Sequence, residues 1–134
     1  IRHVSGAVHL PIRERWLEGE KAVVDGYERI AGLCRRAKRA LVERDWETLA
    51  QYMNENHRIQ HMISHVGDRN VRMMEAALAN GAMAAKMAGA GGGGTIIILT
   101  HDPEKQMPAL KEAGAARFLT PRPSEGVRVD EAVQ

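Results

Sequence analysis

The sequence contains very little cysteine and few aromatic residues. Cys34 is the only cysteine and aromatic residues make up 4% of the chain, so a disulfide within the chain is excluded and a reducing compartment is favoured. No apolar run approaches the roughly 18 residues that a membrane-spanning helix needs, and no signal peptide is recognisable. We therefore expect a cytoplasmic protein that does not associate with a membrane.

Charge and length narrow the range of possible protein classes further. A net charge of +2 with a pI of about 8.9 is too mild for a nucleic-acid-binding protein, which needs a concentrated basic face. The 134 residues, 44% hydrophobic and 27% charged, are typical of one globular domain. We expect a single domain over residues 1–134. Because the chain begins with Ile1 and not Met, it suggests a fragment or a processed product.

The most informative stretch is a glycine loop between two apolar segments. Five of its six residues are glycine: Gly89, Ala90, Gly91, Gly92, Gly93 and Gly94. The alternation of Met83, Ala85 and Met87 and the β-branched run 95–100 predict two strands joined by this loop. A P-loop or a dinucleotide fingerprint would need a helix directly after the glycines, so both are excluded. A flexible linker is the alternative, whereas glycine also lets backbone approach a ligand closely.

A second stretch combines an apolar and a polar face. Asp45 predicts the N-cap of a helix whose apolar face continues as a polar stripe: Trp46, Leu49, Ala50 and Met53, then Asn56, His57, Gln60 and Ser64. Either the helix bends or ends near Asn56, or the polar stripe lines a cleft.

Three histidines in the same region raise the question of a metal. His57, His61 and His65 follow one another at intervals of four, a spacing that could place two imidazoles on one helix face as zinc ligands. No Glu follows His57 to make the His-Glu-x-x-His motif, and the third histidine drifts by about 80° around the helix. Surface histidines are therefore preferred, and no metal site is assigned.

The remaining pattern predicts a mixed α and β domain. Helices are expected over 11–17, over 20–43, from Asp68 to Gly81 and from Asp102 to Gly114, and further strands over 1–5, 117–119 and 127–129. The long helix carries an apolar stripe that should be buried, with Cys34 as inert packing: Val23, Tyr27, Ile30, Cys34, Ala37 and Leu41. Helices combined with a small antiparallel sheet define an α+β class.

Two of these segments resemble motifs of one enzyme family. Residues 81–94, Gly-Ala-Met-Ala-Ala-Lys-Met-Ala-Gly-Ala-Gly-Gly-Gly-Gly, are similar to the third conserved motif of the GHMP kinases (galactokinase, homoserine kinase, mevalonate kinase and phosphomevalonate kinase). Met53-Asn54-Glu55-Asn56-His57 resembles the Met-Asn-x-Asn-His segment of sugar-kinase-like and mevalonate-kinase-like members. The resemblance covers roughly residues 6–129 and only the carboxy-terminal half of such a kinase. It implies a ferredoxin-like antiparallel sheet packed on helices.

The resemblance also implies a function. The chain would be the substrate-side domain of an ATP-dependent kinase that phosphorylates a hydroxyl of a sugar or sugar phosphate, with ATP and Mg²⁺ bound in the complete enzyme. The amino-terminal domain that carries the Gly-Ser-rich phosphate loop is absent from this chain, which is therefore expected to be inactive alone. The loop from Gly89 to Gly94, with Lys86, would support that phosphate loop and border the substrate. Asn54, Asn56 and His57 would bind the acceptor, and no residue is assigned a catalytic role.

Departures from the family pattern leave alternatives open. Ala84 stands where many members have glycine, and Ala88 stands where a Ser or Thr often precedes Gly-Ala-Gly, so one hydrogen bond to phosphate or to the loop is lost. The alternatives are a non-catalytic small-molecule-binding or regulatory module, a kinase with a mevalonate-type acceptor and, from the histidines alone, a metal-binding helical protein. A homodimer is also kept open.

Overall fold

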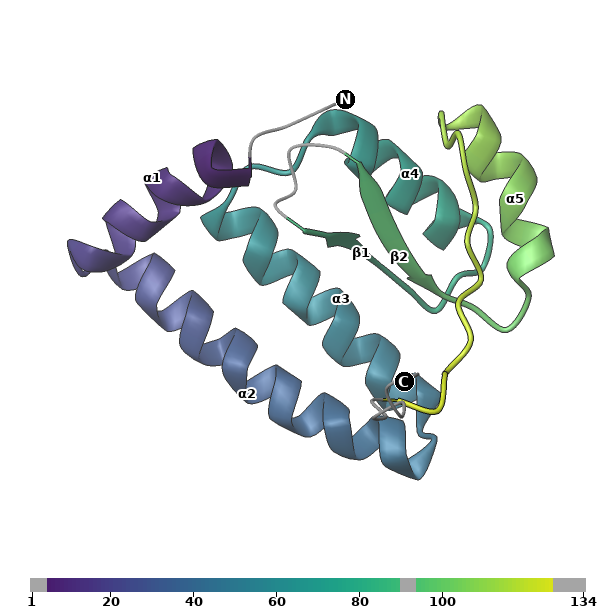
Figure 1. Cartoon of the computed structure of the whole chain (residues 1–134), viewed down its shortest axis with the longest axis horizontal. Coiled ribbons are helices and arrows are strands. Elements are labelled where there is room, and N and C mark those ends of the chain that lie inside the picture. The colour runs from purple at the N-terminus through teal and green to yellow at the C-terminus, as the bar shows by residue number, and fades with distance from the viewer. Residues whose placement is uncertain (1–4, 90–93, 127–134) are drawn as a thin grey trace, which may run out of the picture.

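A computed structural model describes residues 5–89 and 94–126 of the chain. Its elements follow the order α1 (Ser5–Leu17), α2 (Lys21–Glu43), α3 (Trp46–Ile63), α4 (Asp68–Ala79), β1 (Ala84–Ala88), β2 (Thr95–Leu99) and α5 (Pro103–Glu112). Helices α2 and α3 form an antiparallel hairpin, α3 runs beside the β1–β2 hairpin, and α4 and α5 complete the other side of the molecule (Figure 1). No helix in this part of the chain is long and apolar enough to cross a membrane.

A tight connection produces the α2–α3 hairpin. Arg44 ends α2 in the left-handed conformation, at φ 58°. Asp45 then caps α3, because its carboxylate accepts a hydrogen bond from the Thr48 amide at 3.0 Å. The cap occupies one of the free N–H groups of the first turn. The predicted start of this helix is therefore confirmed.

The two hairpin helices pack through a small apolar core. It is formed by Ile12, Val23, Leu33, Ile59 and Ile63. Gly26 allows close approach, since a Cβ at this position would lie 3.0 Å from the Ile63 Cγ2 atom.

The predicted apolar stripe of α2 is correct only in part. Val23 is buried, but Tyr27, Cys34 and Leu41 are exposed, so the inert, buried Cys34 that the sequence predicts is wrong. The buried side of α2 runs instead through Gly26, Leu33 and Ala40. Gly26 and Ala40 on this side are small, so a pattern based on large apolar residues predicted a stripe displaced around the helix.

The second core lies between α4 and one face of the sheet. β1 and β2 are antiparallel, with Ala85 opposite Ile98 and Met87 opposite Ile96. These side chains pack against α4 and α5 in a core with Met73, Met74, Ala77 and Leu110. The two strands joined by the glycine loop are thus confirmed, and helices packed on an antiparallel strand pair agree with the predicted α+β class.

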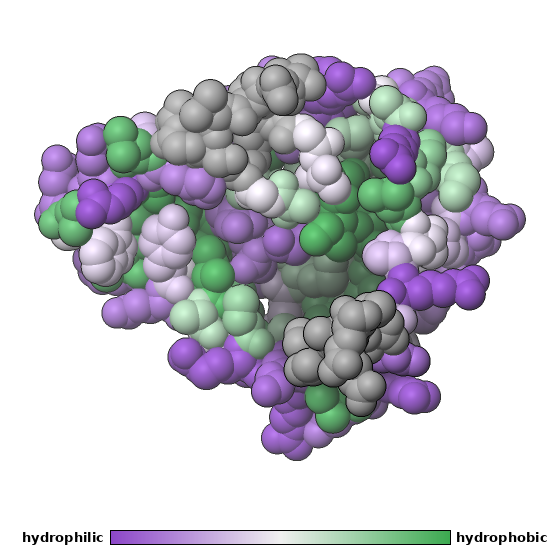
Figure 2. Space-filling view, in the orientation of Figure 1, coloured by the Kyte–Doolittle hydropathy of each residue, from purple (hydrophilic) through white to green (hydrophobic). Residues whose placement is uncertain are grey.

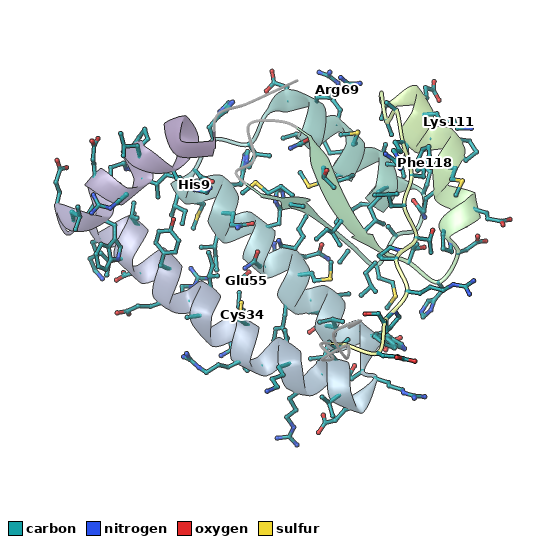
Figure 3. All side chains as sticks on the ribbon, viewed as in Figure 1. His9, Cys34, Glu55, Arg69, Lys111 and Phe118 are labelled. Carbon is teal, nitrogen blue, oxygen red and sulfur yellow. The ribbon has the colours of Figure 1, made fainter. Side chains whose placement is uncertain are left out.

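Several predicted boundaries need correction. Helix α1 begins at Ser5 and continues through Pro11, although proline inside a helix removes one hydrogen bond and crowds the carbonyl four residues earlier. Asp68 is the first residue of α4 and Gly67 its cap. Asp102 does cap α5, accepting from the Lys105 amide at 3.1 Å. The segment 117–119 is not a strand, although Phe118 packs against the α4 core (Figure 3). Of the strand predicted over 1–5, Ser5 is helical and the rest lies outside the described residues, as does the strand predicted over 127–129.

Candidate functional site on the face beside the glycine loop

Asn54 of α3 fixes the position of β1. Its Nδ2 group donates a hydrogen bond to the Met83 carbonyl oxygen at 3.0 Å, and its Oδ1 atom accepts one from the Ala85 amide at 3.2 Å. β2 pairs with the other edge of β1, so the Asn54 amide occupies the place of a neighbouring strand. Because both ends of this amide are bound to backbone, Asn54 acts in the structure as a clamp between α3 and the start of the glycine motif.

The polar stripe of α3 carries unpartnered polar atoms. The helix continues past Asn56 to Ile63, so it does not end where the pattern changes. Asn56, His57 and Gln60 are half-buried. Each has a buried atom without a hydrogen-bond partner in the described structure: Asn56 Oδ1, His57 Nδ1 and Gln60 Oε1. Buried polar atoms are normally paired in proteins, so these three atoms make the stripe a candidate surface for a polar ligand.

Lys86 lies on the face of the sheet opposite the α4 core. Ala85 and Met87 belong to that core, and side chains alternate along a strand, so Lys86 projects to the other face. Its Nζ group donates to the Met87 carbonyl oxygen at 2.9 Å. Burial lowers the pKa of the Lys86 amine, and negative charge on the nearby Cys34 sulfur of α2 opposes this by raising that pKa.

His57 lies close to Lys86. Burial is the main cause that lowers the pKa of His57, and the positive charges of His61 and Lys86 lower it further. The His57 and His61 rings are 6.0 Å apart, between centroids. In the described segments no group of three or more His, Cys, Asp and Glu side chains could hold a metal ion, and the triple-histidine pattern does not form one.

The stripe ends at the glycine loop. Gly89 and Gly94, the two loop residues that the structure describes, have φ angles of +77° and +110°, and a Cβ at either would meet nothing within 4 Å. Ala90, Gly91, Gly92 and Gly93 lie outside the described residues. A small pocket of about 50 Å³ joins Gly89 to α1, α2 and α3, and its lining is His9, Ile12, Tyr27, Ile30, Gln60, Ile63, Ser64, Met87 and Gly89.

Together these residues form one face, which we call the concave face: Tyr27, Ile30 and Cys34 of α2, Asn56, His57 and Gln60 of α3, Lys86 and Gly89. Figure 2 shows a hollow between the α2–α3 hairpin and the sheet. In Figure 3, Cys34 projects from the middle of α2 toward α3.

The sequence alone placed Gln60 on a polar stripe that could line a cleft, but it did not assign Tyr27, Ile30 and Cys34 to a site. These three residues belong to the apolar stripe that was predicted to be buried. One feature of the sequence could have identified them: α2 carries large apolar residues on a second side as well as on its buried side.

Comparison with known proteins shows the family to which the region around this face belongs. Residues 37–117 match the family model described as GHMP kinases C terminal. The chain belongs to this family. The matched GHMP kinase region includes the Asn54 clamp, the polar stripe and the glycine loop, so the resemblance seen in the two sequence motifs is confirmed.

Individual relatives agree with this assignment. The chain is 32% identical over 111 residues to probable glucuronokinase 2 of Arabidopsis thaliana, covering 81% of this chain and 30% of that protein. It is 26% identical over 129 residues to mevalonate kinase of Pyrococcus furiosus, covering 92% of this chain and 39% of that protein. The chain therefore spans about a third of the length of these relatives.

A solved structure shows the same fold. The crystal structure of L. major mevalonate kinase in complex with R-mevalonate matches with a TM-score of 0.74 at 22% sequence identity, over 84% of this chain and 34% of that one. The GHMP kinase carboxy-terminal fold is thus shown, with its helices and a two-stranded antiparallel hairpin.

Proposed function

We propose that this chain is the acceptor-side domain of an ATP-dependent small-molecule kinase that phosphorylates a hydroxyl of a sugar or sugar derivative. The supporting observation is the row of unpartnered buried atoms on Asn56, His57 and Gln60 that leads to Gly89. Hydroxyl groups can donate and accept hydrogen bonds at such atoms. Membership of the GHMP kinases and the names of the relatives support the reaction class.

The residues divide between positioning and binding. Asn54 holds β1 against α3 and thereby sets the start of the glycine loop. Asn56, His57 and Gln60 would hydrogen-bond the acceptor, orienting its hydroxyl toward the phosphate. Such positioning is a large part of phosphoryl-transfer catalysis, because the protein mainly supplies geometry and electrostatic stabilisation.

The concave face suits the phosphates of ATP better than it suits Mg²⁺. The open space at Gly89 and Gly94 suits close approach of backbone to a phosphate or to a phosphate-binding loop. Mg²⁺ prefers carboxylate oxygens, but Glu55 of α3 is paired with Arg29 and Arg58, and the described residues include no acidic cluster. We assign the Mg²⁺ ligands and the main ATP contacts to a separate amino-terminal kinase domain, which is the proposed partner of this chain. The exposed free thiol of Cys34 is consistent with the cytoplasm as its compartment.

A mevalonate-type acceptor is the second candidate. It is favoured by the match to the Pyrococcus furiosus mevalonate kinase, which extends over 92% of this chain.

Phosphoryl transfer in the complete kinase tests the proposal. The full-length gene product is incubated with ATP, Mg²⁺ and a panel of neutral sugars, sugar acids, sugar phosphates and R-mevalonate, and ADP release is measured. We expect transfer to one acceptor class and a loss of kcat/KM of roughly 10- to 100-fold in an Asn56→Ala variant, because a hydrogen bond to the acceptor is removed. Gln51→Ala, on an exposed position of the same helix, is the matched control. Binding without transfer to any acceptor would favour the non-catalytic module.

A further inference from the structure

The concave face carries the positive charge of Lys86, for which the described residues provide no counter-ion. Lys86 is half-buried, and the ion pairs found among the described residues do not include it. Glu55, two residues before His57, is occupied by Arg29 and Arg58. Burying a charged amine without a counter-charge is unfavourable. A residue kept in this state is typical of a site whose counter-ion arrives with the ligand.

The hydrogen bond of Lys86 leaves donors available. An ammonium group has three N–H donors, and one of them is used by the Met87 carbonyl oxygen at 2.9 Å. The groups whose charges couple to Lys86 are the Cys34 thiol on one side, which adds a negative charge only when it is ionised, and His57, followed by His61, on the other. An anionic group of a ligand would therefore find attraction at Lys86 without repulsion from these neighbours.

We propose that Lys86 determines acceptor specificity by binding a carboxylate, so that the acceptor is a hydroxy acid such as a sugar acid and not a neutral sugar. This inference rests on the proposed kinase function. The amides of Asn56 and Gln60, which have free buried oxygen atoms, bind the hydroxyl groups of the same molecule. The relatives are consistent with this division, since glucuronate, implied by the name glucuronokinase, and R-mevalonate each carry one carboxylate and at least one hydroxyl.

Calorimetric titration of the full-length protein tests the carboxylate directly. Glucuronate and glucose form a matched pair, because they differ only in having a carboxylate or a CH₂OH group at carbon 6. We expect glucuronate or R-mevalonate to bind at least about tenfold more tightly than glucose. Lys86→Met should weaken binding of the acid by about 10- to 100-fold, as expected for the loss of a hydrogen bond to a charged group. It should leave the affinity for glucose unchanged.

Control variants separate charge from structure. Lys86→Arg keeps the positive charge and should retain most of the preference for the acid. Lys105→Met changes an exposed lysine of α5 and should bind as the unmodified protein does. The urea midpoint of Lys86→Met should not fall, because replacing a partly buried amine by an apolar side chain removes a desolvation cost.

Alkylation of Cys34 gives a second readout that is independent of activity. Cys34 is the only cysteine of this domain and its thiol lies close enough to Lys86 to affect the pKa of its amine. Glucuronate or R-mevalonate should slow the reaction of Cys34 with iodoacetamide, and Lys86→Met should abolish this protection.

The outcomes distinguish the two proposals. Equal binding of glucose and the acids, no binding of either acid, or an unchanged affinity in Lys86→Met would overturn the carboxylate site. Tighter binding of glucose 6-phosphate than of glucuronate would also overturn it and assign a phosphate instead. Transfer of phosphate to neutral sugars alone would retain the kinase and reject this inference. Carboxylate binding at Lys86 without transfer to any acceptor would reject the kinase and retain the site.

Discussion

The two faces of the β1–β2 hairpin differ in how completely they are covered. On one face, Ala85 and Met87 lie with Ile96 and Ile98 in the core formed with α4 and α5. On the other face, the partner of Lys86 across the sheet is Ile97, which is 47% exposed. The first face is apolar and closed, whereas the second carries the charge of Lys86 and is open at Ile97. The difference indicates that one face stabilises the domain and the other is available to a ligand or to another domain.

The closed face should give the largest loss of stability when it is truncated. Met74 of α4 is 3% exposed within this core, and Met74→Ala is expected to reduce the free energy of unfolding by about 2–5 kcal/mol because it leaves a cavity. Met62→Ala removes a methionine that is 68% exposed and should change stability by less than about 0.5 kcal/mol. Urea denaturation followed by circular dichroism measures both. Equal effects would contradict the assignment of a closed face.

Breaking the link between α3 and β1 should cause the next largest loss of stability. Asn54→Ala removes both hydrogen bonds to Met83 and Ala85 and leaves a backbone carbonyl and an amide without these partners. We expect a loss of about 2 kcal/mol, from roughly 1 kcal/mol for each bond, in the same denaturation experiment. Gln51→Ala, at an exposed position one turn earlier, provides the control. An unchanged midpoint for Asn54→Ala would show that the clamp does not hold β1.

Gly26 and Gly32 of α2 allow the effect of a substitution at a buried position to be compared with that at a more accessible one. Gly26→Ala would place a Cβ 3.0 Å from the buried Ile63 side chain, and we expect destabilisation of about 1 kcal/mol or more because the contact is overpacked. At Gly32 the nearest atom is the end of the Arg36 side chain at 3.4 Å, which can move. Gly32→Ala should therefore stabilise the protein by up to about 1 kcal/mol through helix propensity. Thermal unfolding distinguishes the two signs, and stabilisation by both would place the helix contact elsewhere.

The sequence predicted what depends on local chemistry. The caps Asp45 and Asp102 and the strand pair around the glycines were visible because each depends on residues adjacent in the chain. The buried side of α2 was missed because Gly26 and Ala40 are small, and only packing against α3 reveals that they are inside. A strand at 117–119 was predicted from local propensity, but pairing depends on partners distant in sequence.

The candidate site was predictable in part for the same reason. The motif of residues 53–57 and the glycine loop drew attention to Asn54 and Lys86, and the structure brings both to β1. The sequence could not distinguish the roles of neighbouring residues. Asn54 is bound to backbone at both ends of its amide, whereas Asn56, two residues later, has a buried oxygen without a partner. This contrast arises from the direction in which each side chain leaves α3.

The smallest expected effect is a pH dependence of stability that arises from His57 on the concave face. The pKa of His57 is lowered from its ordinary value of 6.5 by burial and by the charges of His61 and Lys86, while Lys86 in turn lies near Cys34. The unfolded chain therefore takes up this proton at a higher pH than the folded chain does, and stability is lost as the pH falls below about 6.5.

Replacing His57 should make the loss of stability with acid shallower. Urea midpoints of the original protein and of His57→Asn, measured between about pH 7.5 and pH 5, should diverge as the pH falls because only the original protein resists protonation at this position. His65→Asn, which alters an exposed histidine after the end of α3, is the control for replacing an imidazole elsewhere. Parallel curves for His57→Asn and the original protein would mean that His57 is solvated, and the polar stripe would then lie on an ordinary wet surface. A shallower curve would support a partly desolvated face in which a ligand, and not water, completes the hydrogen bonding.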